Sequence, residues 1–230
     1  MAKEDINARI KEFLDVALRR FLVQDYNEAI RELKAAEVLD KNNPEIIYNL
    51  GINYTRLGLY KTAIPYFERL LNLSAAFINN QEIRKITAYI YIKQDNFDRA
   101  ESLVNQVIRL DPSDASAHNM KGYCLEKKGN IDEAILAYQA ILDLEEENIN
   151  ACNSLAYILA YTEKDLNRAL QLARRACKAS PDNPAYCDTL GFILIKKKDF
   201  KNAEKFLKKA AKLAPFSQEI REHLDIVGKS

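Results

Sequence analysis

The chain has 230 residues, with 34 lysines and arginines against 33 aspartates and glutamates, and 48% of its residues are apolar. This composition is too apolar for a disordered chain and too evenly charged for a dedicated binder of polyanions. Only six glycines and six prolines are present, which excludes an all-β sandwich or barrel with a turn about every ten residues. The composition therefore predicts long helices.

The N-terminal segment and the cysteines indicate where such a chain would work. Met1 to Arg20 carries charge throughout, and no stretch approaches the roughly 18–20 apolar residues of a membrane span. We therefore expect a cytoplasmic protein with no integral membrane segment, or a periplasmic one if a signal has been removed. The cysteines form no CxxC pair, and only two histidines accompany them, so buried free thiols and no metal site are expected. They are Cys124, Cys152, Cys177 and Cys187.

An internal repeat is the strongest pattern in the sequence. An alanine lies three residues after an aromatic or aliphatic residue six times, at spacings of 34, 37, 34, 35 and 34 residues. These alanines are Ala29, Ala63, Ala100, Ala134, Ala169 and Ala203. A second column of small residues keeps step with them and consists of Ala17, Gly51, Ala88, Gly122, Ala156 and Gly191. A fixed period of this length is typical of a repeat array.

One repeat, residues 44–77, shows what each unit should be. Pro44 suits the first turn of a helix, where its missing N–H is not needed. One face of that helix then follows as Ile47, Leu50, Gly51 and Tyr54. Gly58 is placed to end the helix in a left-handed conformation, and a second apolar stripe begins at Ala63. Each unit is therefore predicted to be a helical hairpin whose small residues let its two helices approach closely.

These units resemble tetratricopeptide repeats, which combine small residues in both helices with an aromatic or aliphatic partner and a closing proline. The segments NSLAYILA (153–160) and PDNPAYCDTLGFILIKKKDF (181–200) are similar to bacterial members of that superfamily. The resemblance implies an all-α fold, a right-handed superhelical α-solenoid of six helix-turn-helix units with a C-terminal capping helix. It also implies a non-enzymatic protein-interaction module or adaptor in a multiprotein assembly.

The repeat spacing predicts the domain boundaries. Residues 1–9 lead into the first helix, and residues 218–230 form the capping helix and tail. The six repeats are expected at 10–43, 44–77, 81–114, 115–148, 149–183 and 184–217. Three extra residues near 78–80 lengthen the spacing between the second and third repeats, where we expect the array to bend or shift.

No residue set in the sequence supports catalysis or a bound cofactor. Neither GxGxxG nor GxxxxGK[ST] occurs, so the chain lacks the common phosphate-binding loops. His118 falls in a column of helix-opening residues and His223 in the capping helix, and both are interpreted as packing or surface residues. We expect no enzyme activity, no cofactor and no metal.

A third column, one residue after the small column, predicts the binding surface. A step of one residue turns about 100° around a helix, so these side chains leave the face packed within the hairpin. The resemblance places them on the concave groove of the array, together with the residues one turn earlier. The predicted groove comprises Tyr48, Ile52, Lys85, Tyr89, Asn119, Tyr123, Asn153, Tyr157, Asp188 and Phe192. Cations expected at its edge, which would attract an acidic peptide, are Arg56, Lys93, Lys127 and Lys196.

The predicted partner is therefore a peptide or helix of another protein. The carboxylate clamp that resembling arrays use for chaperone C-termini is absent, because Leu14 and Leu18 stand at its leading positions. Two alternatives remain open: a self-assembling scaffold or homo-oligomer, and the regulatory portion of a larger enzyme. Residues 115–148 hold seven acids against three lysines, and 184–230 hold ten bases against six acids, which would pair such copies. The formal net charge of the whole chain is only +1, so a nucleic acid partner is not expected despite the lysines of 201–212.

Overall fold

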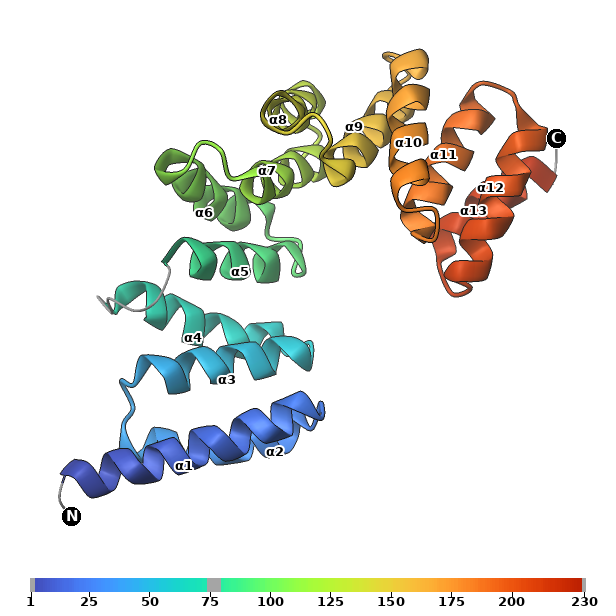
Figure 1. Cartoon of the computed structure of the whole chain (residues 1–230). Helices are drawn as coiled ribbons and strands as arrows, with labels where there is room; N and C mark the ends of the chain where they lie inside the picture. The colour runs from blue at the N-terminus through green and yellow to red at the C-terminus, as the bar shows by residue number, and fades with distance from the viewer. Residues whose placement is uncertain (1–2, 74–79, 229–230) are drawn as a thin grey trace. The chain divides into compact units, whose positions relative to one another are not determined.

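The computed structural model describes residues 3–73 and 80–228, and thirteen α-helices account for the regular structure of these ranges (Figure 1). The predicted all-α fold is confirmed. The extra residues expected near 78–80 lie largely outside the described part of the chain, as do residues 229 and 230 of the predicted tail.

The helices divide between two compact units, each described by itself. Unit 1, Met1–Leu110, contains α1 to α6, and unit 2, Asp111–Ser230, contains α7 to α13. The helices of unit 1 are α1 (Lys3–Leu22), α2 (Tyr26–Leu39), α3 (Pro44–Arg56), α4 (Tyr60–Asn72), α5 (Asn80–Ile92) and α6 (Phe97–Leu110). Those of unit 2 are α7 (Ala115–Lys127), α8 (Ile131–Leu144), α9 (Ile149–Tyr161), α10 (Leu166–Ala179), α11 (Pro184–Lys196), α12 (Phe200–Leu213) and α13 (Gln218–Gly228).

Sequential helices pair as antiparallel hairpins inside each unit. In unit 1, α1 packs with α2, α3 with α4 and α5 with α6, while α2 contacts α3 and α4 contacts α5. In unit 2, α7 packs with α8, α9 with α10 and α11 with α12, and consecutive hairpins contact one another in the same way. The predicted stacking of helical hairpins into an α-solenoid is thus observed within each unit.

Short polar side chains start many of these helices. Asp114, Asn148 and Asp165 each accept a hydrogen bond from the backbone N–H three residues later. The side chains of Asn43 and Asn183 cap the helices that begin with Pro44 and Pro184. These caps satisfy N–H groups that have no partner inside the helix, so each hairpin has a defined start.

The turn between the paired helices uses the left-handed backbone region. Gly58 (φ 72°) and Gly129 (φ 81°) adopt it, as predicted for Gly58. At the corresponding turns of the other hairpins the same region is occupied by residues with a Cβ, namely Gln24, Asp95, Glu163 and Lys198. The turn geometry is therefore common to the repeats even where glycine is missing.

The two small columns are helix contacts, as predicted. All six alanines of the first column are fully buried. A Cβ placed on Gly51 would lie 2.8 Å from the Phe67 ring, and one on Gly122 would lie 2.5 Å from the Tyr138 ring. A larger side chain would therefore force the helices of these hairpins apart.

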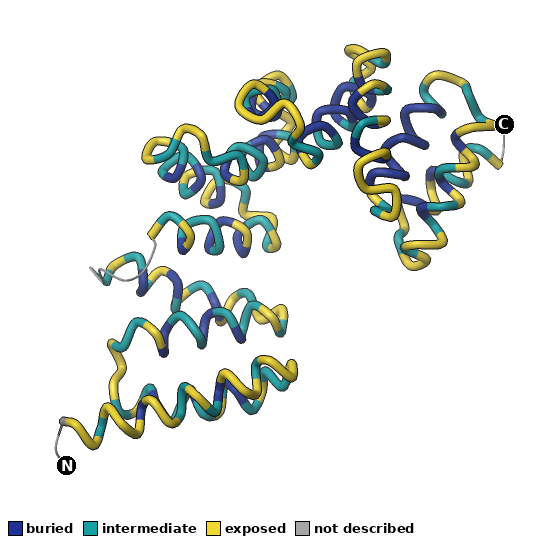
Figure 2. The backbone as a smooth tube through the Cα atoms, in the orientation of Figure 1, coloured by how far each residue is buried: buried dark blue, intermediate teal, exposed yellow. Residues whose placement is uncertain are grey.

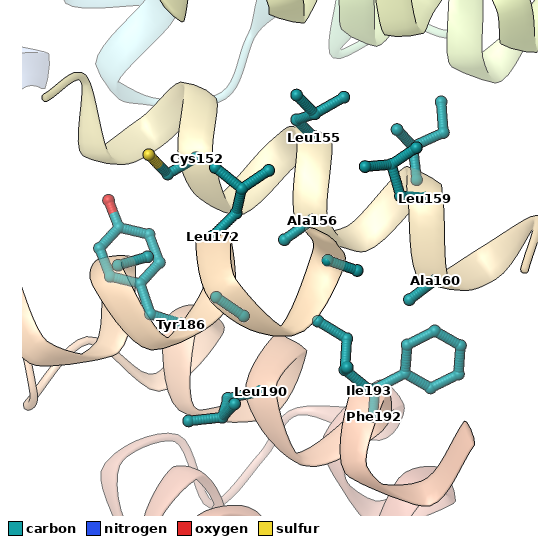
Figure 3. Close-up of a cluster of buried hydrophobic side chains, with 14 of the residues drawn as sticks. Cys152, Leu155, Ala156, Leu159, Ala160, Leu172, Tyr186, Leu190, Phe192 and Ile193 are labelled. Atoms are coloured by element: carbon teal, nitrogen blue, oxygen red, sulfur yellow. The ribbon is translucent and has the colours of Figure 1, made fainter. Parts of the chain in front are cut away.

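The most extensive core lies in unit 2. Buried residues from α7 to α13 form one cluster, and Figure 3 shows Leu155, Leu190 and Ile193 among its side chains on α9 and α11. Nine consecutive residues of α11, Tyr186–Leu194, are buried, so this helix is covered all round rather than on one stripe. The predicted capping helix α13 covers α11 and α12 with Ile220, Leu224 and Val227.

Candidate binding surface on the first helices of the repeats

The side chains of the third sequence column, one residue after the small column, differ in how far they are buried. Tyr89 on α5 is 44% exposed, and Tyr123 on α7 is 38% exposed. Tyr157 on α9 is half-buried, whereas Phe192 on α11 is 8% exposed. Within this column, Tyr89 and Tyr123 are therefore the rings that a partner could reach most easily.

Three of the four predicted edge cations cover rings of this column. The Nζ atoms of Lys93, Lys127 and Lys196 lie 5.4, 5.2 and 5.6 Å from ring centroids one turn earlier in their own helices. Those rings belong to Tyr89, Tyr123 and Phe192. Arg56 differs, since its guanidinium lies over Phe21, 5.9 Å from the ring centroid. The i, i+4 spacing thus produces local cation–π pairs.

Unit 2 brings part of the predicted groove together in one pocket of about 420 Å³. We call it the α7–α13 pocket. Its predicted members are Tyr123, Lys127, Asn153, Tyr157 and Asp188. The residues that complete it, all missed by the sequence reasoning, are Glu126, Tyr138, Ser154, Pro184, Ala185, Thr189, Ala214, Ser217, Glu219 and Ile220.

Carboxylates accept hydrogen bonds from tyrosines in this pocket. The Tyr157 hydroxyl donates to Glu219 Oε1 over 3.3 Å, and the Tyr138 hydroxyl donates to Glu126 Oε2, also over 3.3 Å. The side-chain oxygen of Asn153 is buried and finds no hydrogen-bond partner among the described residues. The wall of the pocket therefore contains a buried acceptor without a donor in the described part of the chain.

Acidic side chains outnumber basic ones in the lining of the pocket. Burial raises the pKa of Glu126, and neighbouring Lys127, whose Nζ lies 3.7 Å from Glu126 Oε1, lowers it only in part. The pKa of Tyr157 is raised by burial and by the charges of Glu219 and Glu126. Among the lining residues three carboxylates face one lysine, so negative charge is incompletely compensated.

The structure covers the last two predicted groove residues with α13. Asp188 is 5% exposed, and its Oδ1 lies 2.9 Å from His223 Nδ1. The Phe192 ring stacks on the His223 ring with a centroid distance of 4.8 Å. Because His223 of the capping helix packs on Phe192, this ring is closed to a ligand in this conformation. The same histidine contacts Asp188, and only the pocket side of Asp188 lines an opening.

Asp188, Glu219 and His223 form a second, unpredicted grouping. Each offers one potential ligand atom, and these atoms lie within 4.8 Å of one another. Glu219 and His223 are four residues apart on α13, a spacing that places both on one helical face. No sequence pattern joins them to Asp188, which lies on a different helix.

The predicted groove residues outside the pocket make local contacts. Tyr48 and Ile52 pack against the buried cluster of α3, α4 and α5, and the Tyr48 ring meets Phe67 edge to face at 6.5 Å. On α5, Lys85 pairs with Glu82 one turn earlier, with 3.2 Å between Nζ and Oε2. Core packing therefore accounts for Tyr48 and Ile52.

The remaining predicted groove residue, Asn119, lies on α7 in unit 2. Its Oδ1 accepts a hydrogen bond from the Ser154 hydroxyl at 3.4 Å, which links α7 to α9. Ser154 itself lines the α7–α13 pocket, so Asn119 contributes to the pocket by holding Ser154 in position and does not line it.

Paired helices, small contact columns and stacked hairpins define the chain as an α-helical repeat protein. Residues 87–149, and separately 44–77 and 184–217, match sequence profiles described as tetratricopeptide repeat, and residues 19–58 match one described as TPR repeat. The chain belongs to the tetratricopeptide repeat superfamily, whose members generally mediate protein–protein interactions.

Similar proteins include subunit 3 of the anaphase-promoting complex of Schizosaccharomyces pombe, 21% identical over 84% of this chain and 34% of its own length. A TPR repeat-containing protein of Pseudomonas aeruginosa is 25% identical over 60% of this chain and 23% of its own length. The chain thus spans about a third or less of these two relatives.

Among solved structures, YrrB, described as a TPR protein with an unusual peptide-binding site, superposes with a TM-score of 0.63. It is 22% identical, and the match covers 86% of this chain and all of YrrB. The pilus biogenesis factor PilW gives a TM-score of 0.74 at 17% identity, over 97% of this chain and all of PilW. These likenesses support the fold.

Hydropathy adds one further finding. Across residues 3–73 and 80–228, no helix is both long enough and apolar enough to cross a membrane.

Proposed function

We propose that the chain is a non-enzymatic interaction module that binds a segment of a partner protein on the first helices of its repeats. The observation that carries this proposal is the α7–α13 pocket, in which the exposed ring of Tyr123 stands beside a buried acceptor on Asn153. An aromatic wall with an unsatisfied acceptor is the kind of surface that recognises peptides.

The relatives support the same kind of role. Subunit 3 of the anaphase-promoting complex is part of a multiprotein complex, and YrrB is described as having a peptide-binding site. For this chain the exposed Tyr123 of unit 2 would supply contact area, with Lys127 covering its ring. Rigid rings on helices bind with little loss of side-chain entropy, so the surface is suited to an extended or helical segment.

Quantitative affinity capture tests the proposal. The chain is used as bait against its native cell extract, and each captured protein is measured by mass spectrometry and then titrated in purified form. Tyr123→Ala should weaken the specific partner about tenfold or more, because an interface aromatic is removed. Phe216→Ala is the matched control, since this ring is 90% exposed on the loop before α13 and does not line the pocket.

A partner that binds both variants as tightly as the parent protein would contradict the use of this surface. Circular dichroism of the Tyr123→Ala variant should show unchanged helicity, because the ring is already 38% exposed.

A further inference from the structure

The charge of the α7–α13 pocket favours a basic ligand, whereas the predicted cations at the edge of the groove favour an acidic one. Its lining holds Glu126, Asp188 and Glu219 against the single cation Lys127. Asp188 is paired with His223, and the Glu126 side chain is only 17% exposed. Glu219 is an exposed residue that accepts a hydrogen bond from the neutral Tyr157 hydroxyl, a contact that leaves its charge in place. A positive group would therefore be attracted into this pocket.

The other lining groups narrow the class of cation. The rings of Tyr123 and Tyr157 border the same space, and aromatic faces attract guanidinium and ammonium groups. The buried oxygen of Asn153 lacks a donor among the described residues, and Glu126 and Glu219 offer further acceptor oxygens. A guanidinium offers five N–H donors in one plane, which suits several acceptors and an aromatic wall at once.

We propose that the α7–α13 pocket is an arginine-binding subsite, in which the guanidinium of a partner protein lies between Glu126 and Glu219 and against the Tyr123 ring. This inference rests on the proposed function, because the arginine is carried by the bound segment. It reverses the expected charge of the ligand from acidic to basic at this position.

The electrostatics of the free pocket agree with this assignment. Burial raises the pKa of Glu126 although Lys127 lowers it in part, so a further cation beside this carboxylate would favour its ionised form. The raised pKa of Tyr157 reflects burial first and then the carboxylates of Glu219 and Glu126. A guanidinium in the pocket would offset these charges without having to lose its proton.

Nuclear magnetic resonance of the whole chain with a defined probe tests the subsite. The probe is a short, terminally blocked Gly-Ser peptide with one central arginine. Its matched control replaces arginine by citrulline, which keeps the shape of the side chain but carries no charge. The arginine peptide should shift the ring signals of Tyr123 and Tyr157 and the amides of α13, and the citrulline peptide should not.

Three isosteric variants refine the test. Glu126→Gln and Glu219→Gln should each weaken the arginine peptide about tenfold or more, because each removes a charge-assisted hydrogen bond. Glu222→Gln is the matched control, since this exposed residue of α13 accepts a hydrogen bond from Gln218 and does not line the pocket. It should bind the peptide as the parent protein does, although its change in net charge is the same.

Equal binding of the arginine and citrulline peptides, or equal loss in all three variants, would overturn the arginine subsite. Binding of zinc chloride with no binding of the arginine peptide would also overturn it, and would assign Asp188, Glu219 and His223 to a metal instead. A captured partner that depends on Tyr123 but not on Glu126 or Glu219 would leave the interaction module standing while the subsite fails.

Discussion

Helix α1 is the first helix of the first hairpin, and helix α11 is the first helix of the last hairpin. The two helices hold the same place in their repeats but are buried very differently. In the described part of α1, only Ile10 and Ala17 are buried, although the helix has 20 residues. In α11, nine consecutive residues are buried, and Figure 2 shows this contrast as a mostly yellow and teal α1 and a dark blue α11.

The difference follows from the neighbours that each helix has. Helix α1 packs extensively with α2, whereas α11 contacts α9, α10, α12 and α13. In a repeat array the contacts are mainly between neighbours, so stability is distributed according to position. The comparison teaches that the third sequence column has different functions along the chain. Its side chain is exposed on α5 (Tyr89) and α7 (Tyr123) but is part of the core on α11 (Phe192).

The largest expected effect comes from emptying the core of α11. Leu190→Ala should lower the free energy of unfolding by about 2–5 kcal/mol, because Leu190 is 3% exposed and its removal leaves a cavity. The matched change on α1 is Leu18→Ala, at a residue that is 56% exposed, and it should cost no more than about 0.5 kcal/mol. Urea denaturation followed by circular dichroism measures both. Equal losses would remove the contrast between the two helices.

The next effect concerns the contact that covers α11. His223→Phe keeps a ring against Phe192 but leaves the buried Asp188 carboxylate without its partner, which should cost about 1–3 kcal/mol. His118→Phe is the control, because this histidine makes a hydrogen bond to Pro112 O that is exposed to solvent. Its effect on the urea midpoint should be small.

The same pair predicts a pH dependence of stability. Burial lowers the pKa of His223, but its hydrogen bond with Asp188 and the nearby carboxylates raise it by more, so the net shift is upward. The stabilisation from the charged pair is therefore complete below the unfolded pKa of about 6.5 and is lost as the pH rises through the folded value. The stability difference between the parent protein and His223→Phe should shrink over that range. A difference that grew with pH would contradict this assignment.

The smallest effect uses two turns with the same backbone angle. Gln24 follows α1, Lys198 follows α11, and both have a φ of 62°. Lys198→Gly should raise the stability by about 0.5 kcal/mol, because relief of the left-handed strain exceeds the entropy that glycine adds. Gln24→Gly should change mainly the local opening of α1 and α2. Identical gains in global stability would show that the two ends of the array unfold together.

The sequence was sufficient to predict the helices and their contacts. The period of the two small columns identified the hairpins, because the paired helices approach so closely that even a methyl group would collide with Tyr138 at Gly122. Turns were harder. Gly58 signals its own conformation, whereas Asp95 and Glu163 adopt the same φ region without glycine because the paired helices around them fix the turn.

The candidate site was predictable only in part. Tyr123, Asn153 and Tyr157 recur in columns that the period identifies, and the resemblance to tetratricopeptide repeats places these columns on the groove. Glu219 reaches the same pocket from α13, more than sixty residues along the chain from Tyr157, and no local pattern relates the two. Burial of Phe192 could not be predicted either, since it depends on which face α13 covers.

Native-state hydrogen exchange tests the contrast between the two ends of the molecule most directly. The amides of α11 should exchange only through global unfolding, because four helices pack around it. The amides of α1 should exchange about a hundredfold faster or more, through local opening of the first hairpin. Equal protection of α1 and α11, or faster exchange in α11, would contradict an array whose stability is set by the number of neighbours that each helix has.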